Sequence, residues 1–434
     1  MKITDLSVLV LFSSALLGCG GATPTTPIWE MSITEDASAI QSLLETGDSL
    51  ITRFSSNSAG VATSETYNWD GALISEREHS DLGPNAKLIQ HSQNDLYSLS
   101  LNGNQSDIVT KLSATFEVQW QINTATTSND DDYRQFAIDI NGQYIAISGA
   151  REVLAASGTE ATEEEFVLLV SATTGEIISD FSIYEYLDVK NIAVTKQGTI
   201  HVGTTHNNLE GDVLLSIYKD YETPGYFGLS VNIDMLATMD EDPILTYRRE
   251  IQGIFNSYIF RFSINNNAQW QNNLGISFLP NGINVTENAI NLFGEHYFSG
   301  ATLINLDAEG NTNWKYHSGN KNGLAKVSLQ SLSNGSKQLS FITESISIIN
   351  EGPYLTRNTT KLNHHIIDAN GEATQKITQE SYIEKRGLWG TRPEVVQAGI
   401  IHSWGGLINE DMKFVLLSDI EGEEQEHETK LALY

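Results

Sequence analysis

Short apolar runs separated by turns of Gly, Asn and Asp fill most of the chain. From residue 28 onward the runs are rich in β-branched and aromatic residues, as in residues 143–148 and 166–170. Helical periodicity does not persist, and only residues 37–44 and 151–156 are compatible with one or two helical turns. The pattern therefore predicts an all-β protein built from many short antiparallel strands.

One hairpin phrase recurs about eight times along the chain. In its clearest copy, residues 303–314, an apolar run enters an acidic turn and a second run leaves it with Trp314. Residues 113–120 and 263–270 keep the same offset from Ser to Trp, and other copies carry Gly in the turn. The repeat assigns structural roles to Trp120, Trp270, Trp314, Asp307, Gly310, Gly371 and Gly422.

The spacing of the hairpins predicts a β-propeller. The turns lie near residues 70, 115, 173, 220, 266, 308, 369 and 420, and blades of known propellers repeat every ~40–50 residues. Two further strands flank a Gly or Asn turn between hairpins, as in residues 136–148 and 191–203. Each unit thus reads as inner strand, Gly turn, second strand, loop, third strand, acidic turn and outer strand.

We expect a single propeller over residues 28–434, made of four-stranded antiparallel blades. Eight blades are favoured, and seven are the alternative if residues 47–78 are too short for a complete blade. The Trp residues are expected on outer strands, packed between neighbouring blades. The Asp or Ser before each turn is expected to accept backbone N–H groups.

The net charge of −30, from 55 acidic and 25 basic residues, narrows the classes of partner. Such a surface repels phosphates, so we expect no nucleic-acid binding. The negative surface could bind a cationic partner or Ca²⁺. The alternative is that it serves solubility in an extracytoplasmic setting.

The N-terminal residues predict export and lipidation. Residues 6–17 form an apolar run too short to span a membrane, and they precede Cys19, the one cysteine of the chain. Residues 16–19 resemble the bacterial lipobox, which implies a signal peptide over 1–18, a lipidated Cys19 and a tether over 19–27. Gly20 resembles the signal for the outer membrane. We therefore expect an outer-membrane lipoprotein of the bacterial cell envelope, facing the periplasm or the cell exterior.

Two propeller families share features with the chain. Residues 306–310 with Trp314 resemble the repeat of pyrroloquinoline-quinone-type propellers, and residues 392–404 with 413–422 resemble one whole blade of that type. The lipobox, the tether and residues 27–33 resemble the opening of the propeller lipoprotein of the outer-membrane β-barrel assembly machinery. That resemblance implies architecture only, including an N-terminal strand that helps to close the ring.

Catalytic and metal-binding motifs are weak. Quinone enzymes of this fold use Ca²⁺ and, in many members, a vicinal disulfide, which a chain with one cysteine cannot form. His201 with His206, and His364 with His365, would point to opposite faces of a strand, which works against metal chelation. The clusters of acidic residues at 163–165 and 240–242 are typical of solvated loops. Weak candidates for Ca²⁺ are Asp130, Asp131 and Asp132, and we otherwise expect no cofactor.

The sequence leaves two functional hypotheses. The leading one is a non-catalytic, membrane-anchored scaffold that binds envelope proteins through loops on one propeller face. The alternative is an envelope enzyme or carbohydrate-binding protein that uses the central funnel, because paired carboxylates converge in space and leave no fixed spacing. Residues 130–132, 155–165 and 350–360 vary between the repeats and are where function is expected.

Overall fold

The computed structural model contains only β-strands as regular elements in the part of the chain that it describes. No helix there could cross a bilayer. The described residues are 28–33, 40–46, 50–56, 61–82, 86–92, 95–100, 108–123, 136–139, 141–154, 161–183, 187–206, 211–218, 225–229, 231–251, 254–263, 268–319, 324–332, 335–350, 355–386, 394–397, 400–408, 414–421 and 427–433.

Within the described residues, the strands form eight antiparallel sheets, seven of four strands and one of five. We number the sheets in chain order. The first sheet is β2 (Ile40–Thr46), β3 (Leu50–Ser56), β4 (Ala62–Tyr67) and β5 (Leu73–His79). The second is β6 (Lys87–Ser92), β7 (Asp95–Ser100), β8 (Ile108–Leu112) and β9 (Val118–Asn123). The third is β10 (Phe136–Ile138), β11 (Tyr144–Leu154), β12 (Ala161–Ser171) and β13 (Ile177–Ser182). The fourth is β14 (Leu187–Val194), β15 (Ile200–His206), β16 (Val213–Ile217) and β17 (Gly225–Gly228).

The second half of the chain continues the same arrangement. The fifth sheet is β18 (Ile233–Met239), β19 (Asp242–Ile251), β20 (Ile254–Phe262) and β21 (Ala268–Ile276). The sixth is β22 (Phe278–Thr286), β23 (Ala289–His296), β24 (Gly300–Leu306) and β25 (Thr312–His317). The seventh is β26 (Leu324–Ser331), β27 (Lys337–Asn350), β28 (Leu355–Ile367), β29 (Ala373–Arg386) and β30 (Glu394–Gln397). The eighth is β31 (Ile400–Ile408), β32 (Phe414–Glu421), β33 (His427–Leu433) and β1 (Trp29–Ile33).

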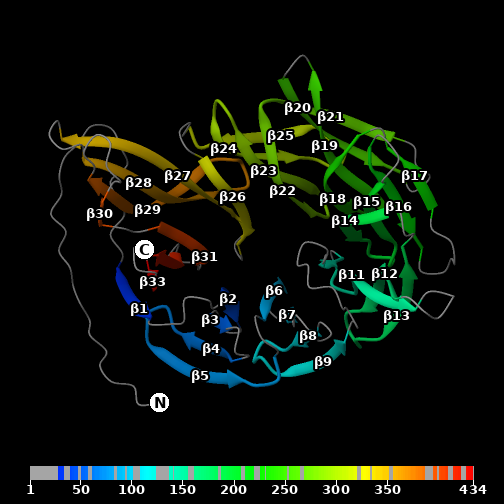
Figure 1. The fold of residues 1–434 in the computed structure, drawn as a ribbon, viewed down its shortest axis with the longest axis horizontal. Coiled ribbons are helices and arrows are strands. Elements are labelled where there is room, and N and C mark those ends of the chain that lie inside the picture. The colour runs from blue at the N-terminus through cyan, green and yellow to red at the C-terminus, as the bar shows by residue number, and fades with distance from the viewer. Residues whose placement is uncertain are drawn as a thin grey trace.

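Consecutive sheets are arranged around a common centre, which makes the fold a β-propeller of mostly four-stranded antiparallel blades (Figure 1). Within the first six sheets each strand pairs with the next one in the chain, so the predicted strand order is confirmed. The recurring hairpin is the third and outer strand of a sheet, as β24 and β25 illustrate.

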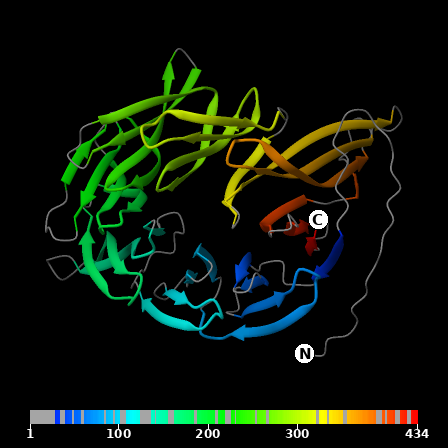
Figure 2. The same ribbon diagram turned by 180° about the vertical axis from the view of Figure 1, so that it is seen from behind.

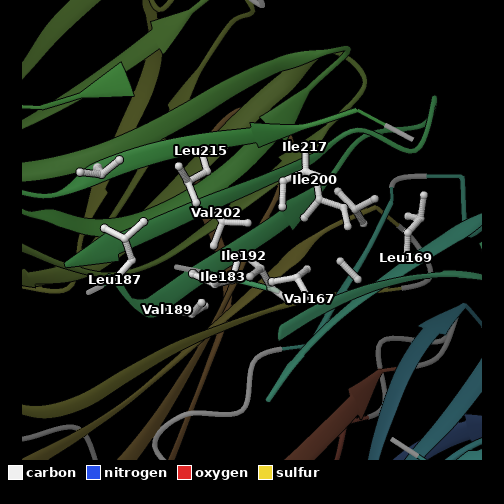
Figure 3. Close-up of a cluster of buried hydrophobic side chains, with 13 residues drawn as sticks. Val167, Leu169, Ile183, Leu187, Val189, Ile192, Ile200, Val202, Leu215 and Ile217 are labelled. Atoms are coloured by element: carbon white, nitrogen blue, oxygen red, sulfur yellow. The ribbon is translucent and has the colours of Figure 1, made fainter. Parts of the chain in front are cut away.

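The core of the molecule lies between the sheets. Buried clusters join the eighth sheet to the first, the first to the second, and so on to the seventh. Figure 3 shows the cluster between the third and fourth sheets, where Val167 and Leu169 of β12 face Val202 of β15 and Leu215 of β16. β28 and β29 contact β31, and β31 contacts β2, so packing continues from the seventh sheet through the eighth to the first.

The eighth sheet corrects one prediction. Residues 394–397 were expected to begin the last blade, but β30 pairs with β29 as the fifth strand of the seventh sheet. The last sheet takes three strands from the C-terminal end, and its outermost strand, β1, comes from the N-terminal end, as the resemblance implied for that strand. Seen from behind, the blue N-terminal strand lies beside the red C-terminal strands (Figure 2). Because β1 and β33 lie at opposite ends of the sequence, no local sequence pattern indicates that they pair.

The two expected helical turns are wrong. Residues 40–46 form β2, whose Leu43 and Leu44 are both buried because the strand is covered on both faces. Residues 151–154 extend β11, and Arg151 lies opposite Glu164 of β12. At residues 40–46 an apolar run covered on both faces loses the alternation that marks a strand, which explains the error there.

Candidate docking surfaces

Tryptophan side chains on outer strands join neighbouring sheets. Trp270 of β21 donates its indole N–H to the carbonyl oxygen of Ala308 at 3.0 Å, and its ring covers Gly310 of the sixth sheet. The same joint recurs for Trp120 on Ala172 and Gly175, for Trp314 on Ala369 and Gly371, and for Trp29 on Trp69 and Gly71. A Cβ added at Gly310 would lie 2.6 Å from the Trp270 ring, so only glycine fits beneath it.

The turn that receives each Trp is fixed by a side-chain acceptor. Asp307 accepts the backbone N–H of Asn311 at 2.7 Å and the side-chain amide of Asn311 at 3.0 Å, and these bonds lower the pKa of Asp307. Gly310 has φ of +81°, a conformation that Gly adopts readily. Asp307, Gly310 and Gly371 therefore shape the turns on which the Trp residues rest.

Cations reinforce two of these joints, a feature that the sequence did not indicate. Arg261 of β20 donates to the Ala308 carbonyl at 3.1 Å and pairs with Asp242 at 3.0 Å. Lys111 of β8 donates to the Ala172 carbonyl at 2.9 Å and pairs with Asp95 at 3.0 Å. Each cation lies directly across the strand pair from a docking Trp.

Three of the four histidines singled out in the sequence are part of the core, and the side chain of His206 lies outside the described part of the structure. His201 is fully buried between the Ser216 hydroxyl and the Glu241 carbonyl, and burial lowers its pKa to about 4. His364 contacts the Ser340 hydroxyl and has a pKa of about 3, also lowered by burial. His365 bonds to the Tyr316 hydroxyl at 2.6 Å. The described residues contain no group of three or more His, Cys, Asp or Glu that could hold a metal ion.

The acidic clusters serve contacts between elements where they are described. Glu164 pairs with Arg151, and Glu165 accepts the backbone N–H of Val189 in the fourth sheet. Glu241 accepts the hydroxyl groups of Thr195 and Thr199 of the fourth sheet. These carboxylates therefore link strands and sheets. Outside the described residues lie Cys19, Gly422, Asp130, Asp131 and Asp132.

Large apolar side chains are exposed in two places. Twelve such residues are exposed in the described part of the chain, and ten fall into two groups. We call the first group the aromatic patch: Phe255, Ile276, Tyr297 and Phe298. We call the second group the aliphatic rim: Ile28, Leu73, Ile74, Val118, Ile177 and Ile178.

The aromatic patch is built from three adjoining backbone segments of the fifth and sixth sheets. The N–H of Ser277 donates to the Phe255 carbonyl at 3.2 Å, and the N–H of Tyr297 donates to the Ser277 carbonyl at 3.0 Å. Tyr297 and Phe298 are 76% and 58% exposed. Their rings pack edge to face with the ring centroids 5.0 Å apart. The patch thus presents large side chains from a fixed backbone frame.

A histidine holds the turn that carries Tyr297 and Phe298. The Nδ1 atom of His296 accepts the backbone N–H of Phe298 at 3.3 Å, and the His296 carbonyl accepts the N–H of Ser299 at 3.0 Å. The His296 ring meets the His317 ring at 5.7 Å. Burial, and then the charge of Lys315, lower the pKa of His296 and so favour the neutral ring.

The patch and the Trp joints lie on opposite faces of the propeller. Tyr297 and Phe298 connect a second strand to a third, and Ser277 connects one sheet to the next. In an antiparallel meander these connections lie at the opposite strand ends from the turns between third and outer strands, which hold Gly310. Tyr297 and Phe298 occupy a turn where Gly, Asn or Asp is usual, a local signal that the sequence analysis did not use.

No family model and no curated protein matches the chain. Solved structures with a similar shape include a prolyl endopeptidase. It is 12% identical to this chain with a TM-score of 0.44, and the alignment covers 70% of this chain and 45% of that one. An acylaminoacyl peptidase from Pyrococcus horikoshii is 10% identical with a TM-score of 0.44, over 90% of this chain and 59% of its own. A protein of unknown function from Bacteroides caccae is 10% identical with a TM-score of 0.36, over 66% and 94%. The chain thus spans about half the length of the peptidases.

Proposed function

We propose that the chain is a non-catalytic scaffold of the bacterial cell envelope that holds a protein partner on its aromatic patch. The supporting observation is the exposure of Phe255, Ile276, Tyr297 and Phe298 on one face of the fifth and sixth sheets. Contiguous exposed apolar surface on a soluble domain is typical of an interaction site, and aromatic residues dominate the binding energy of protein interfaces.

The frame of the patch also supports binding. The turn of Tyr297 and Phe298 is held by backbone bonds to Ser277 and by the His296 ring, so these side chains lose little freedom when a partner covers them. The alternative, an enzyme or carbohydrate-binding protein that uses the central funnel, has no specific observation in its favour among the described residues.

The proposal includes the anchor and the ring. Cleavage after residue 18 and lipidation of Cys19 would hold the propeller at the membrane through residues 19–27. We propose further that all eight sheets are blades of one closed ring. Buried clusters between successive sheets, the contacts of β31 with β28 and β2, and the pairing of β1 with β33 support this number.

The patch is tested by the double variant Tyr297→Ser with Phe298→Ser. Proteins crosslinked to the tagged chain in intact cells would be compared by mass spectrometry. We expect at least a tenfold loss of the specific crosslinked proteins. The control, Val61→Ser, changes an exposed apolar residue outside both groups and should retain them. An unchanged set of proteins in the patch variant would contradict the proposal, provided that its urea unfolding midpoint matches the parent.

The anchor is tested by labelling cells with an alkynyl fatty acid. The parent chain should incorporate the label and sediment with membranes. The Cys19→Ala variant should lose both properties. Equal membrane retention of the two chains would refute the lipid anchor and leave the patch to be judged on its own test.

A further inference from the structure

The aliphatic rim follows one edge of the propeller over four consecutive sheets. Leu73 and Ile74 begin β5 of the first sheet, Val118 begins β9 of the second, and Ile177 with Ile178 begins β13 of the third. Ile28 precedes β1, the outermost strand of the eighth sheet. All six side chains are at least 38% exposed.

Among the described residues, the fifth, sixth and seventh sheets do not continue the rim. Leu73, Val118 and Ile177 occupy equivalent register positions, each opposite the last residue of the third strand or the one before it. The corresponding residues on the fifth, sixth and seventh sheets are Ala268, Thr312 and Ala373. The turns and pairings are the same, so blade architecture does not require large aliphatic side chains here.

Contacts between sheets bring the rim residues into one row. Trp29, next to Ile28, packs on Gly71, which lies two residues before Leu73. Arg77 of β5 donates to the Thr115 carbonyl at 3.1 Å, close in sequence to Val118. Trp120, two residues after Val118, packs on Gly175, two residues before Ile177. The joints thus hold the exposed aliphatic residues of successive sheets beside one another.

The chain enters the propeller at the end of this row. Ile28 is 68% exposed and is the residue at which the N-terminal segment reaches the first strand. If Cys19 carries a lipid, residues 19–27 separate it from Ile28 and span at most ~30 Å even when fully extended. The rim is therefore the apolar surface closest to the anchored end.

We propose that the aliphatic rim rests on the surface of a phospholipid bilayer and orients the propeller with its aromatic patch away from the membrane. This inference rests on the lipid anchor of the proposed function. The patch lies on the opposite face, on the fifth and sixth sheets, whereas the rim lies on the eighth, first, second and third sheets. A partner on the patch would thus approach from the aqueous side.

Charges beside the rim define the lipid that it accepts. Glu76, Glu117 and Glu176 are exposed near the aliphatic residues, with Arg77 as a basic neighbour of Glu117, and the chain carries a net charge of −30. Anionic lipid would repel this edge over a distance of about one Debye length, ~8–10 Å at physiological salt. We therefore expect contact with zwitterionic phosphatidylethanolamine and phosphatidylcholine, and weaker contact when anionic lipid is added.

The test measures how close single positions lie to the bilayer. The lipidated full-length chain would carry one added cysteine, labelled with a fluorophore, as Ile74→Cys, Ile178→Cys, Thr312→Cys or Tyr297→Cys. Vesicles of phosphatidylethanolamine and phosphatidylcholine would contain brominated acyl chains, which quench a fluorophore in contact with the hydrocarbon. Thr312→Cys is the control, because it holds on β25 the place of Leu73 and Ile177, one residue before the place of Ile74 and Ile178.

We expect at least a twofold loss of fluorescence for labels at positions 74 and 178. Labels at positions 312 and 297 should lose less than about a tenth of their fluorescence. Quenching at 74 and 178 should weaken when a third of the lipid is phosphatidylglycerol. Vesicle flotation with no quenching at 74 and 178, or with equal quenching at all four positions, would overturn the orientation while leaving the anchor intact. Failure of the lipidated chain to float would overturn the anchor and the orientation together.

Discussion

The joint between Trp270 and Gly310 shows how single residues position whole sheets. The indole N–H satisfies the Ala308 carbonyl, and the ring covers a glycine whose φ is +81°. The offset of Trp270 from the turn of its own hairpin was readable in the sequence, whereas the turn of Gly310 that receives it belongs to the next sheet. The cation Arg261, which shares the same carbonyl, was not readable, because its partner belongs to the next sheet.

Gly310→Ala should destabilise the protein more than Gly335→Ala. Both glycines have positive φ, so each alanine adds about 1–2 kcal/mol of backbone strain. A Cβ at Gly310 also meets the Trp270 ring at 2.6 Å, whereas at Gly335 it meets nothing within 4 Å. Overpacking should add about 1–3 kcal/mol at Gly310. Urea unfolding measures the difference, and equal losses in the two variants would contradict the role of the joint.

Acid should destabilise the protein through its buried histidines. Burial lowers the pKa of His201 to about 4 and that of His364 to about 3, below the usual 6.5. The unfolded chain therefore takes up protons first, so the free energy of unfolding should fall as the pH drops from about 6.5 towards 4. His201→Gln removes one such group.

The pH dependence of that variant can be measured by urea unfolding at several pH values. Between pH 6.5 and 4 its unfolding free energy should fall less steeply than that of the parent. Parallel curves for the two proteins would show that His201 does not titrate as its burial implies.

Strand order could be predicted at the scale of the element, and the resemblance implied an N-terminal closing strand, but the place of β30 could not be predicted. Periodicity and turn residues placed the hairpins, and six sheets follow them in chain order. β30 was assigned to the wrong sheet because a four-residue strand fits either edge equally well by pattern alone. Its place was decided by pairing with β29, and the open edge of β33 is covered by β1.

Removal of β1 should weaken the ring at one place. A variant that begins at Glu35 lacks all five residues of β1, and it exposes the edge of β33 and the cluster around Leu431. A matched variant that begins at Ile28 keeps the strand. We expect the shorter chain to unfold at a temperature lower by roughly 5 °C or more. Equal melting temperatures would show that β1 does not close the eighth sheet.

The two exposed apolar surfaces appear only at the scale of the whole molecule. Leu73, Val118 and Ile177 are more than 40 residues apart in sequence, and each alone is an ordinary strand residue. Phe255 joins Tyr297 through the backbone of Ser277, a contact between two sheets. The sequence could thus predict a propeller with function in its loops, but not which loops gather apolar side chains on one face.

The central claim is that the aromatic patch receives a protein and the aliphatic rim does not. The most direct measurement places benzoylphenylalanine at position 298 or at position 178 in living cells and follows the crosslinked products after illumination. We expect discrete protein adducts from position 298 and none above background from position 178. Protein adducts from position 178 alone, or the same adducts from both positions, would contradict the account.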